Sequence, residues 1–173
     1  MEPFSLRPFL PGDAEAVQTM ILEKQAEPVA VYDYAMPTEE HQLRALAAYF
    51  ASEPSYLAIC AGDMPVGYAV LHVQSDRGSL GYFLRPAWRG RGWVNQACAA
   101  LLARAFAGGM AAAEAGAALA NAPSVAVLTR LGFRQVRRER VSFHQDDQGR
   151  PLEFESGVYE LTRTQWEEMY PCA

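Results

Sequence analysis

The spacing of hydrophobic residues along the chain changes abruptly just before Trp93, and this change restricts the possible folds more than any other feature. Ahead of it, three short apolar segments follow one another with polar turns between them: 56–61, 65–74 and 79–85. This spacing predicts an antiparallel meander of three strands. From Trp93 onward, apolar residues recur every three or four positions up to the Gly108-Gly109 pair, a pattern typical of a helix that ends at glycine. A loop containing Gly90 and Gly92 joins the two patterns.

The rest of the chain alternates between strand and helix patterns. The further strands are expected at 4–8, 110–120, 133–143 and 151–161, and the helices at 13–24, 39–52, 93–107, 121–131 and 164–170. Asp13 and Thr38 are expected as helix caps. Residues 110–120 are rich in alanine, which favours a helix, but their place between two helices favours a strand. The order predicts an α/β (α+β) fold, with one mixed, mostly antiparallel sheet of about seven strands and helices on both faces. Residues 1–173 are expected to form a single domain.

Composition excludes several classes of protein. Half of the 173 residues are hydrophobic and 20% are charged, which is typical of a globular chain. The net charge of −5 gives no basic footprint, so we expect no nucleic-acid partner. The longest uncharged run, 115–129, is shorter than the roughly 20 apolar residues of a membrane span. Cys60, Cys98 and Cys172 are far apart and form no metal motif, so we expect a cytoplasmic protein without disulfides or metal.

The glycine loop is a candidate anion site. Glycines allow a bulky oxyanion to approach the amides at a helix N-terminus, and Arg85, Arg89 and Arg91 add positive charge. A Walker loop is excluded because Gly-Lys-Ser/Thr is absent. A dinucleotide fingerprint is disfavoured, since the third glycine is missing and a meander precedes the loop. A pyrophosphate loop for coenzyme A is the third interpretation, and a glycine-rich turn with solvated arginines is the alternative to any anion site.

Several motifs carry a resemblance to the GCN5-related N-acetyltransferase (GNAT) superfamily. RGRGWV at 89–94 resembles the family loop R/Q-x-x-G-x-G/A except at its last position. NAPSVAVLTRLGF at 121–133 looks like the N-x-x-S-x-x-V-x-x-K-x-G-F stretch of the RimJ/RimL-like branch, which acetylates protein N-termini and small amines. GYFLRPAWRGRGW at 81–93 is similar to that branch's G-Y…P…W-G-x-G-Y, and the C-terminal turn and Trp166 look like its hairpin and tail.

This resemblance implies acetyl-CoA as the co-substrate. It places the pantetheine arm against the strand that ends at Leu84 and the pyrophosphate on the amides of residues 89–94. It also implies that Asn121 contacts the pantetheine arm and that Ser124 lies near the thioester sulfur. The cofactor-binding residues implied in this way are Phe83, Leu84, Arg85, Arg89, Gly90, Arg91, Gly92, Trp93, Val94, Asn121 and Ser124.

Acetyl transfer to an amine requires a group that removes a proton from the amine. Glu114 is the first candidate, because it is the only charge in the apolar stretch 105–129 and relatives often carry Glu at this register. As the base it is expected to be buried, and the alternative is that it points to solvent at a strand edge. Glu139 and His144 are weaker candidates. Cys98 lies on the apolar stripe of its helix, so direct attack of the amine in a ternary complex is preferred over an acetyl-cysteine intermediate.

Three positions depart from the family pattern. Leu128 stands where many relatives carry a tyrosine acid, so Ser124 or Tyr159 would have to serve as the proton donor. Val94 replaces a small residue in the loop, and Gln96 stands where the RimJ/RimL-like branch often has Glu. These departures motivate a rival interpretation, a non-catalytic sensor that binds CoA or acyl-CoA. A second rival is a dinucleotide-dependent oxidoreductase.

The preferred hypothesis is an N-acetyltransferase acting on a primary amine, with a protein N-terminal α-amine ahead of a small-molecule amine. We expect either a monomer or a homodimer as the working form. In the fold that the resemblance implies, the first two helices and the 26–37 loop wall the acceptor side. Its acidic and aromatic residues suit a cationic amine or a solvated loop equally: Glu27, Tyr32, Asp33, Tyr34, Glu39 and Glu40.

Overall fold

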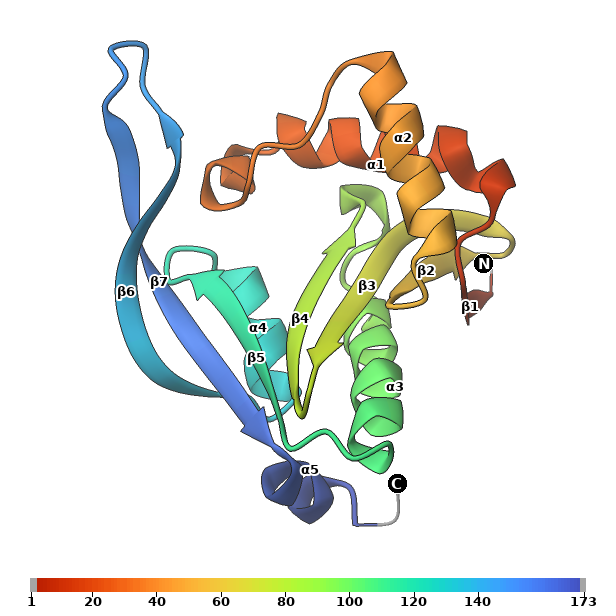
Figure 1. The fold of residues 1–173 in the computed structure, drawn as a ribbon, viewed down its shortest axis with the longest axis vertical. Helices are drawn as coiled ribbons and strands as arrows, with labels where there is room; N and C mark the ends of the chain where they lie inside the picture. The colour runs from red at the N-terminus through yellow and green to blue at the C-terminus, as the bar shows by residue number, and fades with distance from the viewer. Residues whose placement is uncertain (1–2, 172–173) are drawn as a thin grey trace. The chain divides into compact units, whose positions relative to one another are not determined.

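A computed structural model describes residues 3–171, so Cys172 lies outside the described residues (Figure 1). Within that range, seven strands form one sheet in the order β1-β2-β3-β4-β5-β7-β6. The strands are β1 (Phe4–Arg7), β2 (Tyr56–Ala61), β3 (Met64–Gln74), β4 (Arg77–Leu84), β5 (Ala112–Ala118), β6 (Arg134–Gln145) and β7 (Pro151–Thr162). β4 and β5 pair in parallel, whereas β1–β2, β2–β3, β5–β7 and β6–β7 pair antiparallel. The mixed, mostly antiparallel sheet predicted from the sequence is therefore confirmed.

The helices also follow the predicted order. They are α1 (Ala14–Ala26), α2 (Glu40–Ser52), α3 (Trp93–Ala107), α4 (Ala122–Arg130) and α5 (Arg163–Met169), with short 3-10 turns at Pro11–Asp13, Pro28–Tyr32 and Pro86–Trp88. The alanine-rich segment is a strand, β5, because Ala113, Ala115 and Ala117 alternate into a buried face. None of the described helices is long and apolar enough to cross a membrane.

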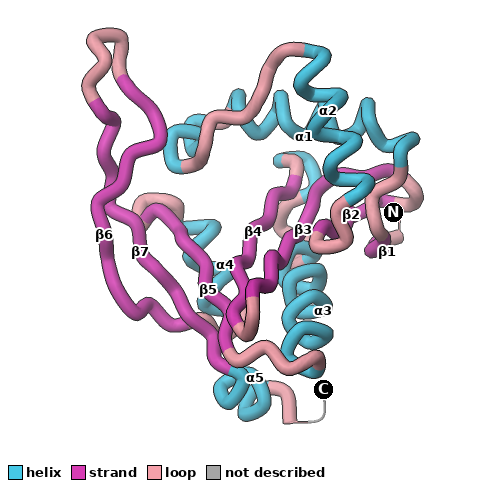
Figure 2. Tube along the Cα trace, in the orientation of Figure 1, coloured by secondary structure: helices cyan, strands magenta, loops and turns pink. Residues whose placement is uncertain are grey.

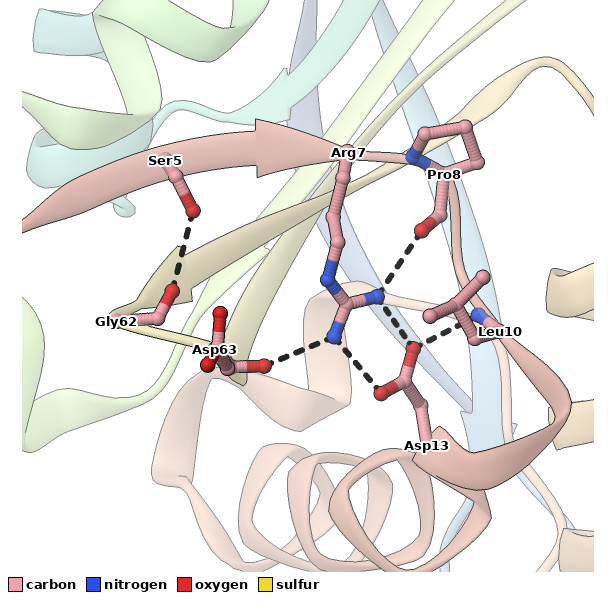
Figure 3. Close-up of polar contacts among 7 residues, drawn as sticks. All are labelled: Ser5, Arg7, Pro8, Leu10, Asp13, Gly62 and Asp63. Atoms are coloured by element: carbon pink, nitrogen blue, oxygen red, sulfur yellow. Dashed lines mark hydrogen bonds and ion pairs between the residues drawn. The ribbon is translucent and has the colours of Figure 1, made fainter.

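The predicted caps of the first two helices are wrong in detail. Asp13 occupies the N-cap position of α1, but its carboxylate does not cap the helix. It accepts hydrogen bonds from Arg7 at 2.7 and 2.9 Å and from the Leu10 N–H at 2.8 Å (Figure 3). At α2 the N-cap residue is Glu39, without a side-chain cap, rather than Thr38. The arginine in β1 outcompetes the helix amides for Asp13, because a bidentate charged pair is stronger than a neutral cap.

The chain divides into two compact units, the first formed by residues 1–27, 36–71 and 81–101. Its core lies where α1 and α2 cover one face of β2, β3 and the end of β4, with Met20, Phe50 and Tyr68 among the buried side chains. Ile59 points to the opposite face of β2. On that side Phe4 contacts Trp93 of α3, with ring centroids 5.5 Å apart. Helices thus cover both faces of the sheet in this unit.

The second unit contains residues 28–35, 72–80 and 102–173. Its most extended feature is the twisted β6–β7 hairpin, which turns around the segment 146–150 (Figure 2). α4 contributes the fully buried Leu128 to the core of this unit. α5 is fixed by Trp166, whose ring lies 5.7 Å from that of Phe106.

Candidate functional site

The junction between β4 and α3, within the first compact unit, is one candidate segment. After Leu84 the chain makes one 3-10 turn, passes through Gly90 and Gly92, and enters α3 at Trp93. Both glycines have left-handed backbones, with φ of +79° and +74°. Such values favour glycine, and a side chain at either position would meet little except the end of Gln96. The backbone of this loop is therefore bare and approachable.

The start of α3 supplies the electrostatics expected of an anion site. The Gln96 N–H donates to the Gly92 carbonyl at 3.1 Å, which closes the first helical turn. The amides of Trp93 and Val94 precede this first intrahelical bond, and the helix dipole places positive charge at this end. α3 is 15 residues long, so its dipole is well developed. A phosphate or diphosphate is the chemistry that fits.

Two of the three loop arginines are engaged by carboxylates at the C-terminal end of α1, Glu23 in the helix and Glu27 at its C-cap. Arg85 donates to Glu23 at 2.6 and 2.9 Å, and Arg89 donates to Glu27 at 2.6 and 2.7 Å. The hydrogen bond from Arg85 lowers the pKa of Glu23, against the smaller opposing effect of burial. The charge that the sequence assigned to these arginines is thus compensated within the protein.

Arg91 has a different environment. Its guanidinium lies 4.8 Å from the ring of Trp88 and 5.3 Å from the ring of Trp93, and the two rings stack 5.7 Å apart. No carboxylate of residues 3–171 forms an ion pair with it. Cation–π contacts hold the guanidinium in place without neutralising its charge.

The end of β4 adjoins this loop. Residues 77–79 pair with residues 112–114 of β5, and the parallel register ends there. β4 then continues to Leu84, where Phe83 and Leu84 are both buried. The Leu84 carbonyl accepts a hydrogen bond from the Arg89 side chain at 2.9 Å.

A second candidate segment lies in the other compact unit, at the start of α4. Asn121 is the N-cap residue, and its side-chain oxygen accepts from the Ser124 N–H at 3.3 Å. Ser124 is partly exposed in the first turn of the helix. This capping bond gives Asn121 a local role in addition to the ligand contact implied by the resemblance.

Glu114 and Tyr159 lie on neighbouring strands but on opposite faces of the sheet. Glu114 pairs with Glu160, and Tyr159 pairs with Ala115. Because successive residues of a strand alternate between faces, the structure does not bring these two side chains together. Glu114 is 40% exposed and lies 3.7 Å from Arg137, so the expectation that it is buried is wrong. Tyr159 is buried.

The weaker candidates are also placed. Glu139 lies beside Arg137 on the hairpin, at 3.7 Å, and is exposed. A ring nitrogen of His144, Nε2, lies 2.7 Å from the Asp33 carbonyl. Cys98 is fully buried in α3, and burial raises the pKa of its thiol, which agrees with a packing role rather than a nucleophilic one.

Comparison with protein families decides the family of the chain. Residues 4–134 match the model described as an acetyltransferase (GNAT) domain. The chain belongs to the GNAT acetyltransferase family. The matched range contains the β4–α3 junction and all of α4, so both candidate segments lie within it. The resemblance inferred from the loop motif is therefore confirmed at the level of the family.

Solved structures share this GNAT fold at low sequence identity. The ribosomal-protein-S5-alanine acetyltransferase of Vibrio fischeri is 14% identical with a TM-score of 0.78, and the match covers 96% of each chain. An N-acetyltransferase of Staphylococcus aureus Mu50 is 16% identical with a TM-score of 0.75, over 93% of this chain and 99% of its own. The Salmonella typhimurium protein yncA, solved with its cofactor acetyl-CoA, is 17% identical with a TM-score of 0.72, over 93% and 94%. A search of curated proteins finds no match.

Sequence reasoning missed Glu23 and placed Glu27 on the acceptor side, whereas Glu27 binds the loop residue Arg89 in this GNAT domain. Both lie near the C-terminal end of α1, where the helix dipole disfavours negative charge. Two carboxylates spaced four residues apart at this end were a signal that cations from elsewhere in the chain approach them. Which cations these are depends on the tertiary fold, and no local pattern specifies it.

Proposed function

We propose that this GNAT protein is an N-acetyltransferase that uses acetyl-CoA to acetylate a primary amine, and that it belongs to the RimJ/RimL-like branch. The observation that carries this proposal is the β4–α3 junction, in which two left-handed glycines lead directly into the positive end of a long helix. Coenzyme A carries a diphosphate, the kind of group that such a junction binds.

The residues present fit acetyl-CoA. The amides of residues 90–94 would bind the diphosphate, because no side chain blocks Gly90 or Gly92. The end of β4 at Phe83 and Leu84 would run beside the pantetheine arm. Asn121 uses its side-chain oxygen for capping, so its side-chain nitrogen is the atom that would donate to this arm. When bound, acetyl-CoA supplies the activated acetyl group as a thioester.

Among the catalytic candidates, Glu114 is the base and Ser124 is the proton donor in this proposal. Glu114 is half-exposed, so it can exchange a proton with water. Ser124 lies in the first turn of α4 and would protonate the leaving thiolate directly or through a water. Tyr159, the alternative proton donor, is buried on the face of the sheet opposite to Glu114, so it would serve only with a base other than Glu114. The amine attacks directly, in a ternary complex.

A protein N-terminal α-amine is the preferred acceptor, ahead of small amines. The support is the RimJ/RimL-like motif at 121–133 together with the structural likeness to ribosomal-protein alanine acetyltransferases of Vibrio fischeri and Escherichia coli. We also propose that residues 1–173 act as one domain in the cytoplasm, as a monomer or homodimer. No metal, nucleic acid or membrane enters the reaction that we propose.

Titration calorimetry with acetyl-CoA tests the loop assignment. Gly92→Glu places a carboxylate where the diphosphate would lie, so it should abolish acetyl-CoA binding. Gly149→Glu is the matched control, because Gly149 has nearly the same φ, +75°, and equally open surroundings in the β6–β7 turn. Unchanged binding in Gly92→Glu, or equal loss in both variants, would reject the assignment of the diphosphate to this loop.

Thiol release with an acceptor panel tests the activity. Peptides that begin with different residues, their N-terminally blocked versions, polyamines and amino acids separate the proposed acceptor classes. Release that requires a free peptide N-terminus supports the preferred acceptor. Thiol release with small amines alone would reject the protein N-terminus as the acceptor but would support the proposal that the protein is an acetyltransferase.

A non-catalytic sensor of acyl-CoA is the second candidate. The observation that favours it is Leu128, which is fully buried at the position where many relatives carry a tyrosine acid. In that case acetyl-CoA binds in the calorimeter, but no acceptor gives thiol release. Binding of acetyl-CoA without thiol release for any acceptor of the panel would therefore favour the sensor over the enzyme.

A further inference from the structure

We infer that the three arginines of the β4–α3 loop have different roles. In this inference Arg85 and Arg89 are positioning residues, fixed by Glu23 and Glu27, and Arg91 alone offers its charge to a phosphate group. The inference rests on the proposed function, because it concerns how acetyl-CoA is held. It goes further by separating residues that the loop motif treats alike.

The first step is the geometry of the two ion pairs. In each pair both carboxylate oxygens accept hydrogen bonds from two guanidinium nitrogens, at 2.6–2.9 Å. Glu23 lies in the last turn of α1, and Glu27 is the C-cap residue directly after the helix. Two bidentate pairs from the end of one helix thus fix the beginning and the middle of the loop.

The second step is the set of contacts made by Arg89. Its Nη atoms bind Glu27, its Nε donates to the Leu84 carbonyl, and its guanidinium lies 5.7 Å from the ring of Phe83. One side chain therefore connects α1, the end of β4 and the residue next to Gly90. This network uses three of the five donors of the guanidinium for the fold itself.

The third step concerns charge. Glu23 and Glu27 compensate Arg85 and Arg89, so these four residues together carry no net charge. Arg91 is exposed and forms no ion pair within the described part of the chain. Trp88 and Trp93 restrict its guanidinium, so little conformational freedom is lost when it contacts an anion. The charge that an incoming phosphate meets in this loop is that of Arg91.

The direction in which one substitution changes the affinity for acetyl-CoA separates this arrangement from a simpler one, in which Arg89 itself binds phosphate. If Arg89 were a phosphate ligand for which Glu27 competes, Glu27→Gln would release Arg89 and tighten binding. If Glu27 positions Arg89, the same substitution loosens the loop and weakens binding. We expect Glu27→Gln and Arg89→Gln each to raise the Kd for acetyl-CoA about fivefold, and the double variant to be no weaker than either single variant.

Arg91 should behave differently. Arg91→Gln should raise the Kd for acetyl-CoA about tenfold and reduce its dependence on salt, since a charge contact with phosphate is lost. It should leave the KM for S-acetylpantetheine, which carries no phosphate, unchanged. Glu27→Gln and Arg89→Gln should raise that KM, because the end of β4 moves with the loop.

The experiment is calorimetry on the full chain with acetyl-CoA and with ADP, which carries a diphosphate but no thioester. Glu15→Gln is the control, as it removes an exposed carboxylate from the same helix; its Kd should stay within twofold of the wild type. Tighter binding in Glu27→Gln overturns the positioning role, and unchanged ADP binding in Arg91→Gln overturns the phosphate role.

The ADP titration separates the two proposals. If the wild type binds ADP with this variant pattern but neither binds acetyl-CoA nor releases thiol, the proposed function fails and the division of roles stands. If the wild type binds neither ligand, the division of roles fails as well.

Discussion

At the scale of single residues, Asp13 shows how a tertiary contact replaces a local one. Burial works to raise its pKa, but the hydrogen bonds from Arg7 and from the Leu10 N–H outweigh burial and lower it below its ordinary value of 3.8. Arg7 also donates to the Asp63 carbonyl at 2.9 Å, so the pair ties β1, the β2–β3 turn and α1 together (Figure 3).

This contact predicts a dependence of stability on acid. Because the folded pKa of Asp13 is depressed, its contribution is complete above the ordinary value and is lost as pH falls through the folded pKa. Asp13→Asn should lower the free energy of unfolding by about 1–3 kcal/mol at pH 7, and the difference from the wild type should shrink below about pH 4. Urea denaturation at pH 7, 4 and 3 measures it. The exposed Asp147→Asn is the control, and a difference that stays constant with pH would contradict the prediction.

A second prediction at this scale compares two carboxylates beside one arginine. Glu114 and Glu139 both lie 3.7 Å from Arg137. If Glu114 is the base, Glu114→Gln should lower kcat about 100-fold and change the low-pH limb of the rate profile, while Glu139→Gln should leave both within twofold. Steady-state thiol release over pH 5–9 measures this. A wild-type profile in Glu114→Gln removes Glu114 from the mechanism.

The residue scale is also where the sequence says least. The sequence alone predicts an approachable loop at Gly90 and Gly92, because a left-handed backbone is a local requirement that favours glycine. It does not predict that Glu23 meets Arg85, since that pair joins residues far apart in the chain. The burial expected for Glu114 fails for the same reason: Arg137 reaches it from β6.

At the scale of elements, periodicity predicts the order of strands and helices, and the ambiguous segment shows its limit. Alanine at seven of the eleven positions of 110–120 favours a helix by propensity. Pairing of β5 with β4 on one side and β7 on the other overrides that preference, since both edges of the strand are hydrogen-bonded. Position in the order of elements was the better guide.

The close approach of β3 to the end of β4 gives a prediction at this scale. A Cβ at Gly67 would lie 2.5 Å from the Phe83 carbonyl oxygen and 2.8 Å from the Leu84 side chain. Gly67→Ala should therefore displace the end of β4, lower the free energy of unfolding by about 1–3 kcal/mol and weaken acetyl-CoA binding. Gly116→Ala in β5 is the control, because its Cβ would meet only the Ser156 hydroxyl at 3.9 Å. Equal stability of both alanine variants, by urea denaturation, would show that β4 has room at Gly67.

At the scale of the whole molecule, the two compact units share their central strands. β3 begins in the first unit and ends in the second, and β4 begins in the second unit and ends in the first. Each of these two strands is therefore divided between the units. The family match likewise runs through both units without a break. We therefore expect the described chain to unfold as one cooperative domain rather than in two steps.

Core substitutions in each unit test that expectation. Met20 in α1 and Leu161 in β7 are both fully buried, and truncating either to alanine removes contacts worth about 2–5 kcal/mol. If the units unfold together, Met20→Ala and Leu161→Ala each shift a single transition, and far- and near-ultraviolet circular dichroism report the same midpoint. Two transitions, of which Met20→Ala moves one and Leu161→Ala the other, would show instead that shared strands do not couple the units. The same unfolding transitions, measured with acetyl-CoA added, also test the proposed function. A ligand that binds the loop raises the unfolding midpoint of every part of the chain that unfolds together with the loop.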